Sequence, residues 1–311
     1  MKAIVYKEKN KVTLENIPIP EIKENGAIIK VRGCGLCGSD IVKLKQGLVK
    51  EGTVLGHEVV GELNGERVVL GHHVPCFDCV YCKNESYSMC AQFKETNIIP
   101  GGFAEYIFVS EKHLKNTVFK VPDEVSDIEA SFTEPAACCL RAVKRAGIKP
   151  GDNVLVVGLG SIGLIMGQIL KYYGANVTGC DLIEKRLEIA KGLGFRTEAI
   201  KEADKVFLTA GSNTTVDIAI SSVRDGGTIL VFASVLSDKV GFPNNEIYYR
   251  ELTVMGSYSP SPSDLREALD LIAKKIIKVD KLFNVYDMIE IENAINDTIS
   301  NKIIKAYIVI S

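Results

Sequence analysis

The sequence predicts an α/β protein built from two unlike parts, and three observations carry this prediction. From about residue 136 to 275, strands alternate with helices, which is typical of a doubly wound parallel sheet with helices on both faces. The first 130 residues contain short strands and turns and are mostly β. The tail at 305–310 is again strand-like and is expected to rejoin the first part. At 311 residues, two domains are the natural expectation.

The individual elements follow from apolar runs and turn signals. In the first part, Asn64-Gly65 is a strong hairpin signal between two strands. In the second part, Ser263 is expected to cap the last helix. The predicted strands are 27–31, 59–63, 67–70, 104–109, 154–157, 176–180, 205–209, 228–232 and 252–255, and the predicted helices are 164–171, 184–193, 217–223 and 264–274.

Composition excludes several classes of function. With 37 basic and 39 acidic residues, the net charge of −2 gives no general attraction for nucleic acid or for an anionic membrane. No apolar run approaches the roughly 20 residues that a membrane helix needs, and 1–6 does not resemble a signal peptide. We therefore expect a cytoplasmic protein, in which the nine cysteines stay reduced.

Four of the nine cysteines form one motif, C-x2-C-x2-C-x7-C, at Cys76, Cys79, Cys82 and Cys90. Two residues between cysteines allow a tight turn to direct both sulfur atoms at one point. Four thiolates around a point form the closed tetrahedral site that structural Zn²⁺ prefers. An iron–sulfur cluster also uses four thiolates, and four unrelated buried thiols are the remaining alternative.

A second candidate metal site combines Cys37, within Gly35–Asp40, with His57 and Glu58. A thiolate and an imidazole are ligands that zinc accepts, and a catalytic zinc keeps three protein ligands and an open position. The glycines beside both segments favour loops. A lone cysteine and a lone histidine are nevertheless common in packed cores, so this pattern by itself is weak.

The dinucleotide signal is a buried strand followed by G-x-G-x-x-G and then a helix. The loop consists of Gly158, Leu159, Gly160, Ser161, Ile162 and Gly163. Its glycines permit a tight turn and a close approach of the backbone to a pyrophosphate. Asp181 ends the next strand, where a carboxylate binds ribose hydroxyls and repels a 2′-phosphate, so NAD is favoured over NADP. Arg186 is the opposing signal, since an arginine can bind that phosphate.

Taken together, these motifs resemble the zinc-dependent medium-chain dehydrogenase/reductase superfamily, and more closely its polyol and threonine dehydrogenase branch. The match covers essentially the whole chain, and it includes the motifs at 37–40, 56–58, 76–90, 101–106, 134–135 and 158–163. It implies a GroES-like, mostly-β catalytic domain at 1–135 and 276–311, with a structural-zinc lobe at about 74–92. It also implies a Rossmann domain at 136–275. The chain is short for this superfamily, and the missing residues fall between Gly61 and Arg67 and between Phe195 and Lys205.

The resemblance also implies roles for residues. Cys37, His57 and either Glu58 or Glu134 would hold a catalytic zinc, and the four clustered cysteines a second zinc. Asp40 would orient His57, and Ser39 would receive the proton of the substrate hydroxyl. Cys138 and Cys139 follow Glu134 and could be confused with a ligand. Val42 stands where some relatives place a histidine of the proton relay.

The function expected from the resemblance is hydride transfer between a secondary alcohol, polyol or sugar alcohol and NAD, by a homodimer or homotetramer. Two alternatives remain open at this point. One is a metal-free reductase of the quinone oxidoreductase type, which lacks the Cys and His-Glu ligands. The other is a non-catalytic NAD or zinc redox sensor, which would not need Ser39 or Glu134.

Overall fold

The computed structural model describes residues 1–234 and 239–310, and these belong to two compact units. The first unit comprises Met1–Ala137, Pro260–Lys274 and Leu282–Ser311. The second unit comprises Cys138–Ser259 and Lys275–Lys281. The chain therefore leaves the first unit and returns to it, which gives the discontinuous arrangement that the strand-like tail predicts.

The first unit is mostly β. Its strands form a hairpin, β1-β2, and a seven-stranded sheet in the order β13-β14-β3-β4-β5-β7, with β6 paired to β3. The hairpin strands are β1 (Lys2–Glu8) and β2 (Lys11–Asn16). The sheet consists of β3 (Ala27–Gly35), β4 (Glu58–Leu63), β5 (Glu66–Leu70), β6 (Tyr106–Val109), β7 (Val118–Lys120), β13 (Asn284–Asp287) and β14 (Ala306–Val309).

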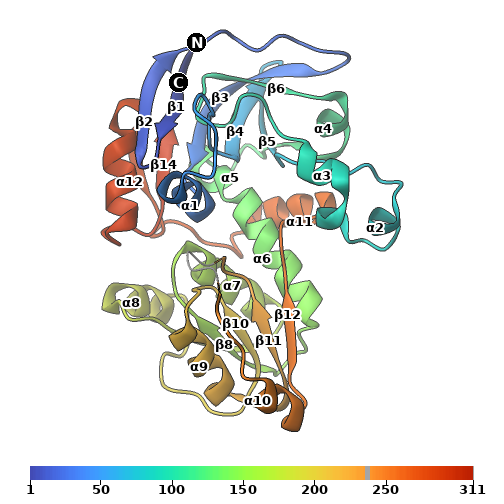
Figure 1. Cartoon of the computed structure of the whole chain (residues 1–311), viewed down its shortest axis with the longest axis vertical. Helices are drawn as coiled ribbons and strands as arrows, with labels where there is room; N and C mark the ends of the chain where they lie inside the picture. The colour runs from blue at the N-terminus through green and yellow to red at the C-terminus, as the bar shows by residue number, and fades with distance from the viewer. Residues whose placement is uncertain (235–238, 311) are drawn as a thin grey trace. The chain divides into compact units, whose positions relative to one another are not determined.

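Two predictions about this sheet are confirmed. The turn at Asn64-Gly65, where both residues have positive φ, joins β4 to β5 in an antiparallel hairpin. The C-terminal strand β14 pairs with β3 near the start of the chain, in the register Ile308 to Cys34. Figure 1 shows β14 among the N-terminal strands, with α12 (Ile291–Ile299) packed beside it. The tail thus completes the sheet from which the candidate metal ligands project.

Short helices surround the sheet of the first unit. They include the helices α1 (Gly38–Gln46), α2 (Val80–Lys83), α3 (Ala91–Glu95), α4 (Glu111–Asn116), α5 (Asp127–Ser131) and α11 (Pro262–Ala273), together with the 3-10 helices η1 (Tyr87–Met89) and η2 (Met288–Glu290). The helix α6 (Thr133–Ala146) begins in the first unit and ends in the second.

The second unit is the expected parallel sheet, with strands in the order β12-β11-β10-β8-β9. Helix α7 packs on β8 and β9, and α9 packs on β10 and β8. Leu155 and Val157 of β8 lie in the apolar cluster that also contains Val216 and Ala219 of α9. The elements are β8 (Asn153–Val157), α7 (Ser161–Tyr172), β9 (Asn176–Cys180), α8 (Glu184–Gly192), β10 (Ala203–Leu208), α9 (Asn213–Ser222), β11 (Val223–Val231), α10 (Asn244–Tyr249) and β12 (Thr253–Gly256).

The predicted shortening between Phe195 and Lys205 has a clear structural form. After α8, the chain forms only an isolated parallel bridge between Arg196 and Thr178 of β9. Arg196 donates to the Val177 carbonyl and its own carbonyl accepts from the Gly179 amide, both at 2.9 Å. A single residue therefore occupies the place beside β9 where a further strand of the sheet would pair.

The compact units differ from the predicted domain boundaries at α11. The sequence interpretation assigns 264–274 to the dinucleotide domain, but Pro260–Lys274 clusters with the first unit. The reason is packing, because Leu265 approaches Gly71 and the Arg266 guanidinium lies 4.9 Å from the centre of the Phe119 ring. The predicted cap was also wrong: Ser261, two residues before Ser263, accepts the backbone N–H of Asp264 and caps the helix.

The described part of the chain contains no helix with the length and apolar character to cross a membrane.

Candidate functional site

The four clustered cysteines converge in a small lobe of the first unit. Their sulfur atoms all lie within 4.8 Å of one another. Sγ of Cys82 lies 3.6 Å from that of Cys79 and 3.8 Å from that of Cys76, which is too far for disulfides. The donor set therefore fits one tetrahedral metal ion, as the spacing predicts.

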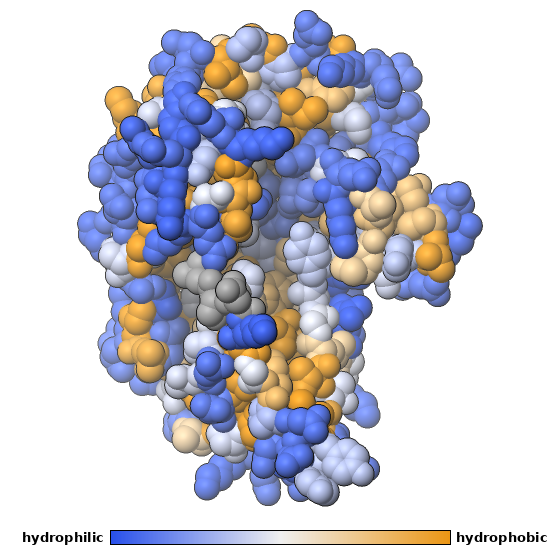
Figure 2. Space-filling view, viewed as in Figure 1, coloured by the Kyte–Doolittle hydropathy of each residue, from blue (hydrophilic) through white to orange (hydrophobic). Residues whose placement is uncertain are grey.

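The surroundings of these cysteines also fit a bound cation. Backbone N–H groups of Asp78 and Cys79 point at Sγ of Cys76, and they lower the pKa of that thiol to about 6. Of the residues that the structure describes, only Phe93 and Tyr87 join the cysteines in the lobe's apolar cluster, so side-chain packing by itself stabilises the lobe weakly. Figure 2 shows apolar side chains gathered on the surface of this lobe, which carries the exposed residues Phe77, Val80, Tyr81 and Met89.

The second candidate site brings Cys37, His57 and Glu58 together. One ligand atom of each lies within 4.8 Å of the others. Cys37 is the N-cap of α1, Glu58 is the first residue of β4, and His57 directly precedes it. Among the described residues these two clusters are the groups suited to a metal ion, and neither includes Cys34, Cys138, Cys139 or Cys180.

Asp40 holds His57 in place. Its Oδ1 lies 3.4 Å from His57 Nδ1, and its Oδ2 accepts the Cys37 backbone N–H at 3.2 Å. Burial opposes the negative charge of Asp40, but His57 outweighs it and lowers the pKa of this carboxyl. Because Nδ1 is occupied, Nε2 of His57 is left for a metal.

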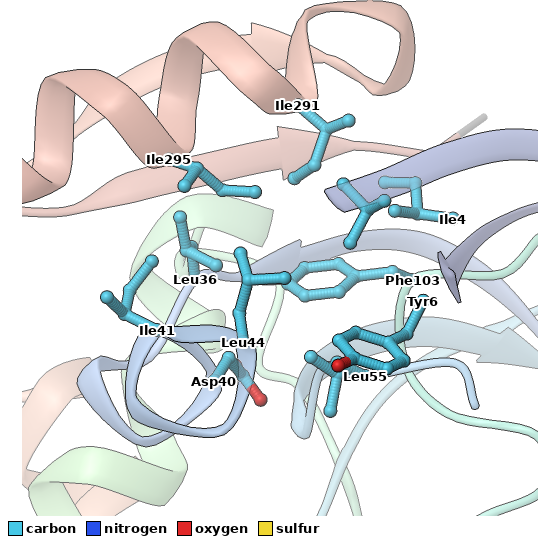
Figure 3. Close-up of a pocket in the computed structure, with 11 residues that line it drawn as sticks. Ile4, Tyr6, Leu36, Asp40, Ile41, Leu44, Leu55, Phe103, Ile291 and Ile295 are labelled. Atoms are coloured by element: carbon cyan, nitrogen blue, oxygen red, sulfur yellow. The ribbon is translucent and has the colours of Figure 1, made fainter. Parts of the chain in front are cut away.

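The opposite side of Asp40 borders an apolar cavity. Figure 3 shows this small cavity surrounded by side chains from β1, α1 and α12, with Asp40 at its edge. Aliphatic and aromatic side chains, among them Leu44, Leu55 and Phe103, form its wall. The partners of the Asp40 carboxylate are therefore the peptide groups and the imidazole on its other side, which fixes its orientation.

Glu58 forms a buried ion pair with Lys305. Lys305 Nζ lies 2.5 Å from Glu58 Oε2, and the two side chains are 5% and 0% exposed. The other carboxylate oxygen, Oε1, is buried and has no hydrogen-bond partner in the described part of the chain. A Cβ at Gly35 would stand 2.0 Å from Oε2, so glycine is required there. A cation bound by Glu58 Oε1, the Cys37 thiol and the His57 imidazole would satisfy this buried oxygen.

Glu134 lies at a different position from Glu58. It is buried in the first turn of α6 but is not within the group formed by Cys37, His57 and Glu58. It lines a small cavity that His72 also lines. The geometry therefore separates the two carboxylates that the sequence leaves as alternatives, and Glu58 is the one beside the other candidate ligands.

Three histidine rings lie against one another next to this site, tilted by 47° between His57 and His72 and by 44° between His72 and His73. The centre of the His72 ring lies 4.7 Å from that of His57 and 4.0 Å from that of His73. Burial, together with the neighbouring rings of His57 and His73, holds the pKa of His72 well below its usual value, so its imidazole is neutral. A ring nitrogen of His73 contacts the Thr96 carbonyl, and His73 belongs to neither metal cluster.

Ser39 is in the first turn of α1, two residues after Cys37. Within residues 1–234 and 239–310, its hydroxyl has no hydrogen-bond partner in the protein. The hydroxyl is therefore free to bind a substrate beside the candidate ligands.

In the second unit, the three glycines of the loop after β8 each meet a different requirement. Gly158 has φ +95°, which permits the turn. Gly160 faces open space, and a Cβ on Gly163 would stand 1.9 Å from the Gly158 carbonyl oxygen. Gly160 is also the N-cap of α7, where no side chain caps the helix. The open amide groups at this helix start suit a pyrophosphate.

Asp181 lies beside this loop and is fixed by three groups. Its Oδ2 accepts the Leu159 backbone N–H at 2.6 Å, and its Oδ1 accepts the Ile183 backbone N–H at 2.9 Å. Arg186 Nη1 lies 3.3 Å from Oδ2. Asp181 is the carboxylate predicted to bind a ribose, and Arg186 is the residue that could instead bind a 2′-phosphate. The structure shows that these two side chains form an ion pair.

Sequence reasoning missed Lys305, Gly35 and the position of His72. Lys305 carries a signal that can be read, because a lone lysine interrupts the apolar run at 303–310. A charged side chain in a buried strand is expected to have a partner of opposite charge. No sequence signal names Glu58 as that partner.

Comparison with known proteins identifies the family. Residues 23–123 match the alcohol dehydrogenase GroES-like domain, and residues 161–274 match the zinc-binding dehydrogenase family. D-altritol 5-dehydrogenase of Agrobacterium fabrum is 33% identical over 83% of this chain and 84% of its own length. Sorbitol dehydrogenase of Bacillus subtilis is 31% identical over 79% of this chain and 77% of its own length.

A solved structure covers the chain nearly from end to end. It is a zinc-binding dehydrogenase from Sinorhizobium meliloti bound to NADP, which is 27% identical, with a TM-score of 0.87 over 99% of this chain and 98% of that one. Together with the matched family models, it agrees with the fold described above. The chain belongs to the zinc-dependent medium-chain dehydrogenase/reductase superfamily, in its polyol dehydrogenase branch.

Proposed function

We propose that this protein is a zinc-dependent oxidoreductase that transfers hydride between a secondary alcohol, polyol or sugar alcohol and a nicotinamide dinucleotide. The observation that carries the proposal is the convergence of Cys37, His57 and Glu58 beside an orphaned carboxylate oxygen. The polyol dehydrogenases among its relatives support the class of substrate.

Cys37, His57 and Glu58 would hold the catalytic zinc, and the four lobe cysteines the structural zinc. When bound, the zinc supplies a Lewis acid for the alcohol oxygen and the dinucleotide supplies the hydride acceptor. Positioning of the ligands and proton transfer would be carried out by side chains of the protein. Asp40 would fix His57 with Nε2 free. The Ser39 hydroxyl would accept the proton of the substrate alcohol and pass its own proton on toward solvent. Glu134 would be the carboxylate that exchanges with the bound ligand.

Gly158, Leu159, Gly160, Ser161, Ile162 and Gly163 would bind the pyrophosphate, and Asp181 the adenosine ribose. With its carboxylate held toward the loop, Asp181 would repel a 2′-phosphate, so we propose a preference for NAD. Arg186 would then serve to hold Asp181, with which it pairs. The predicted homodimer or homotetramer and the predicted cytoplasmic location stay predictions.

Replacing Asp181 by alanine should shift the cofactor preference toward NADP by about tenfold or more, because a ribose ligand is lost and Arg186 is released to bind phosphate. The measurement is the ratio of kcat/KM for NAD to that for NADP. Asp204→Ala is the control, since Asp204 also pairs with an arginine of the second unit but lies away from the loop. Equal use of both cofactors by the unmutated enzyme would contradict the preference for NAD.

The proposed function is tested by metal analysis combined with a panel of secondary alcohols and polyols, each assayed with NAD and NADP. We expect two zinc ions per chain and reduction of the cofactor by at least one polyol. One zinc per chain with activity on quinones would favour the metal-free reductase. Two zinc ions with no oxidation of any alcohol would favour the sensor.

A further inference from the structure

Helix α1 carries the N-cap residue Cys37 and also a lysine, Lys43, one turn beyond Ser39. Lys43 follows Ser39 by four residues and Asp40 by three, and residues at these spacings are neighbours on one side of a helix. Long side chains on a helix point back toward its N-terminus. The sequence position of Lys43 therefore directs its ammonium over the turn that carries Ser39, toward Cys37.

The electrostatic interactions of Lys43 agree with this direction. Burial lowers the pKa of both His72 and His73, and the positive charge of Lys43 lowers each pKa further. At Asp40, burial opposes the negative charge, and Lys43 adds to the effect of His57, which lowers the pKa of the carboxyl. A charge that acts on all of these side chains lies on the side of α1 that faces the candidate catalytic site.

The charge of Lys43 is available to a bound molecule. The side chain is half-buried, and its ammonium forms no ion pair or hydrogen bond with any residue that the structure describes. Asp40, the carboxylate nearest to Lys43 along the helix, contacts His57 and the Cys37 backbone N–H instead. An anion that binds beside Ser39 would therefore meet a cation that no carboxylate of the described chain neutralises by direct contact.

We propose that Lys43 is a specificity-determining residue that binds an anionic group of the substrate, a carboxylate or a phosphate, on the same molecule as the reacting alcohol. The preferred substrates are then sugar acids or phosphorylated polyols rather than neutral polyols. This inference rests on the proposed function and narrows its class of substrate.

The chemistry of a lysine suits either kind of anion. Its ammonium is a compact point charge with three donors on a flexible stem, which can reach carboxylate or phosphate oxygens. Ser39 and Lys43 are one helical turn apart, so their Cβ atoms are about 5–6 Å from each other. The lysine stem adds to this separation, so the anionic group would be attached several bonds away from the reacting carbon. Specificity then follows from the difference in affinity between a substrate that supplies the anion and one that does not.

The test uses matched compounds that differ only in the charge at one end of the molecule. D-Gluconate and D-sorbitol 6-phosphate are each compared with D-sorbitol, and the same comparison is made for the other hexitols and the pentitols. The quantity measured is the ratio of kcat/KM for the anionic compound to that for its neutral counterpart. We expect this ratio to exceed about ten for at least one set. The larger of the two ratios identifies the anion as a carboxylate or a phosphate.

Variants of α1 assign this preference to Lys43. Lys43→Gln should lower the ratio by about tenfold, mainly through KM of the anionic compound, and Lys43→Arg should retain most of it because it keeps the charge. Lys45→Gln is the matched control, since Lys45 is also a half-buried lysine in the last turn of α1. Residues two apart on a helix point in nearly opposite directions, so Lys45→Gln should leave the ratio unchanged. Zinc content and thermal midpoint are measured for each variant.

Salt provides a second measurement, which a purely structural role of Lys43 would not affect. Added salt screens a charge that is open to solvent, and the Debye length falls from about 10 Å at 0.1 M to about 3 Å at 1 M. The ratio should therefore fall with added salt in the unmutated enzyme and much less in Lys43→Gln.

Three results would overturn the proposal. The first is an unmutated enzyme that uses no anionic compound better than its neutral counterpart. The second is an equal loss for anionic and neutral compounds in Lys43→Gln. The third is a higher KM for the dinucleotide in Lys43→Gln with an unchanged ratio, which would assign Lys43 to the phosphates of the cofactor. An unmutated enzyme that oxidises neither anionic nor neutral alcohols refutes the proposed function itself.

Discussion

Replacing Cys37 by serine is expected to remove one of two zinc ions from each chain and to lower kcat/KM for alcohol oxidation by at least about a thousandfold. Cys37 is one of three side chains whose ligand atoms lie within 4.8 Å of one another, so its loss leaves two. A serine hydroxyl is neutral at pH 7 and cannot replace a thiolate as a ligand for zinc. The measurements are zinc per chain by elemental analysis and steady-state kinetics with a polyol.

Cys138→Ser is the matched control for this prediction. Cys138 follows Glu134 in sequence, yet it belongs to neither of the clusters suited to a metal. It should keep two zinc ions and nearly full activity. Cys37→Ser enzyme that retains two zinc ions would disprove the proposed catalytic site, and so would a Cys138→Ser enzyme that loses one. The lobe cysteines provide an internal reference, because their zinc should persist in both variants.

The lobe and the dinucleotide loop are predictable because their geometry is local. The C-x2-C spacings place sulfur atoms within a few residues of one another, and backbone N–H groups of the same turn contact Cys76. The glycines at 158 and 163 meet within one strand–turn–helix unit. In such segments the sequence spacing already specifies the distances in space.

The catalytic cluster is harder to predict, because its parts come from distant segments. Cys37 and His57 are separated by a helix and a loop, and the register of β3 with β4 decides whether Gly35 faces Glu58. Lys305 reaches Glu58 only because β14 pairs with β3. Helical periodicity likewise indicates that α11 has a buried face but does not indicate which unit covers that face, and Pro260–Lys274 clusters with the first unit.

The sequence also leaves open whether Glu58 or Glu134 is the third ligand of the proposed catalytic zinc. Side-chain geometry favours Glu58, which is the residue we propose. Both residues follow a motif of the resembled superfamily, and both are buried. Only Glu58 lies beside Cys37 and His57, and only there does a glycine leave room for the carboxylate. Distances of this kind depend on rotamers and on strand register, which a sequence pattern does not specify.

Replacing Lys305 by methionine is expected to lower the thermal midpoint of the zinc-free protein by about 10 °C, because it strands the Glu58 carboxylate in the interior. The ion pair is 2.5 Å long and its two side chains are 5% and 0% exposed, so water cannot solvate the charge that remains. Burial opposes the charge of Lys305, but the neighbouring Glu58 outweighs burial and raises the pKa of the Lys305 ammonium, so Lys305 is charged at neutral pH. The measurement is thermal unfolding after removal of metal with a chelator.

The double variant Glu58→Gln/Lys305→Met distinguishes two causes of a lower thermal midpoint, which are the unpaired charge of Glu58 and the lost packing of the Lys305 side chain. It removes both charges, so most of the lost stability should return, whereas a loss caused by packing at residue 305 would persist. Lys302→Met is the control on the surface, because Lys302 is 71% exposed and its ion pair with Asp297 adds little to stability.

If Glu58 is a zinc ligand, zinc also neutralises its charge, so adding zinc should raise the thermal midpoint of Lys305→Met more than that of the unmutated protein. An equal rise in both proteins would mean that zinc and Lys305 do not share Glu58, and Glu134 would then be the better candidate for the third ligand.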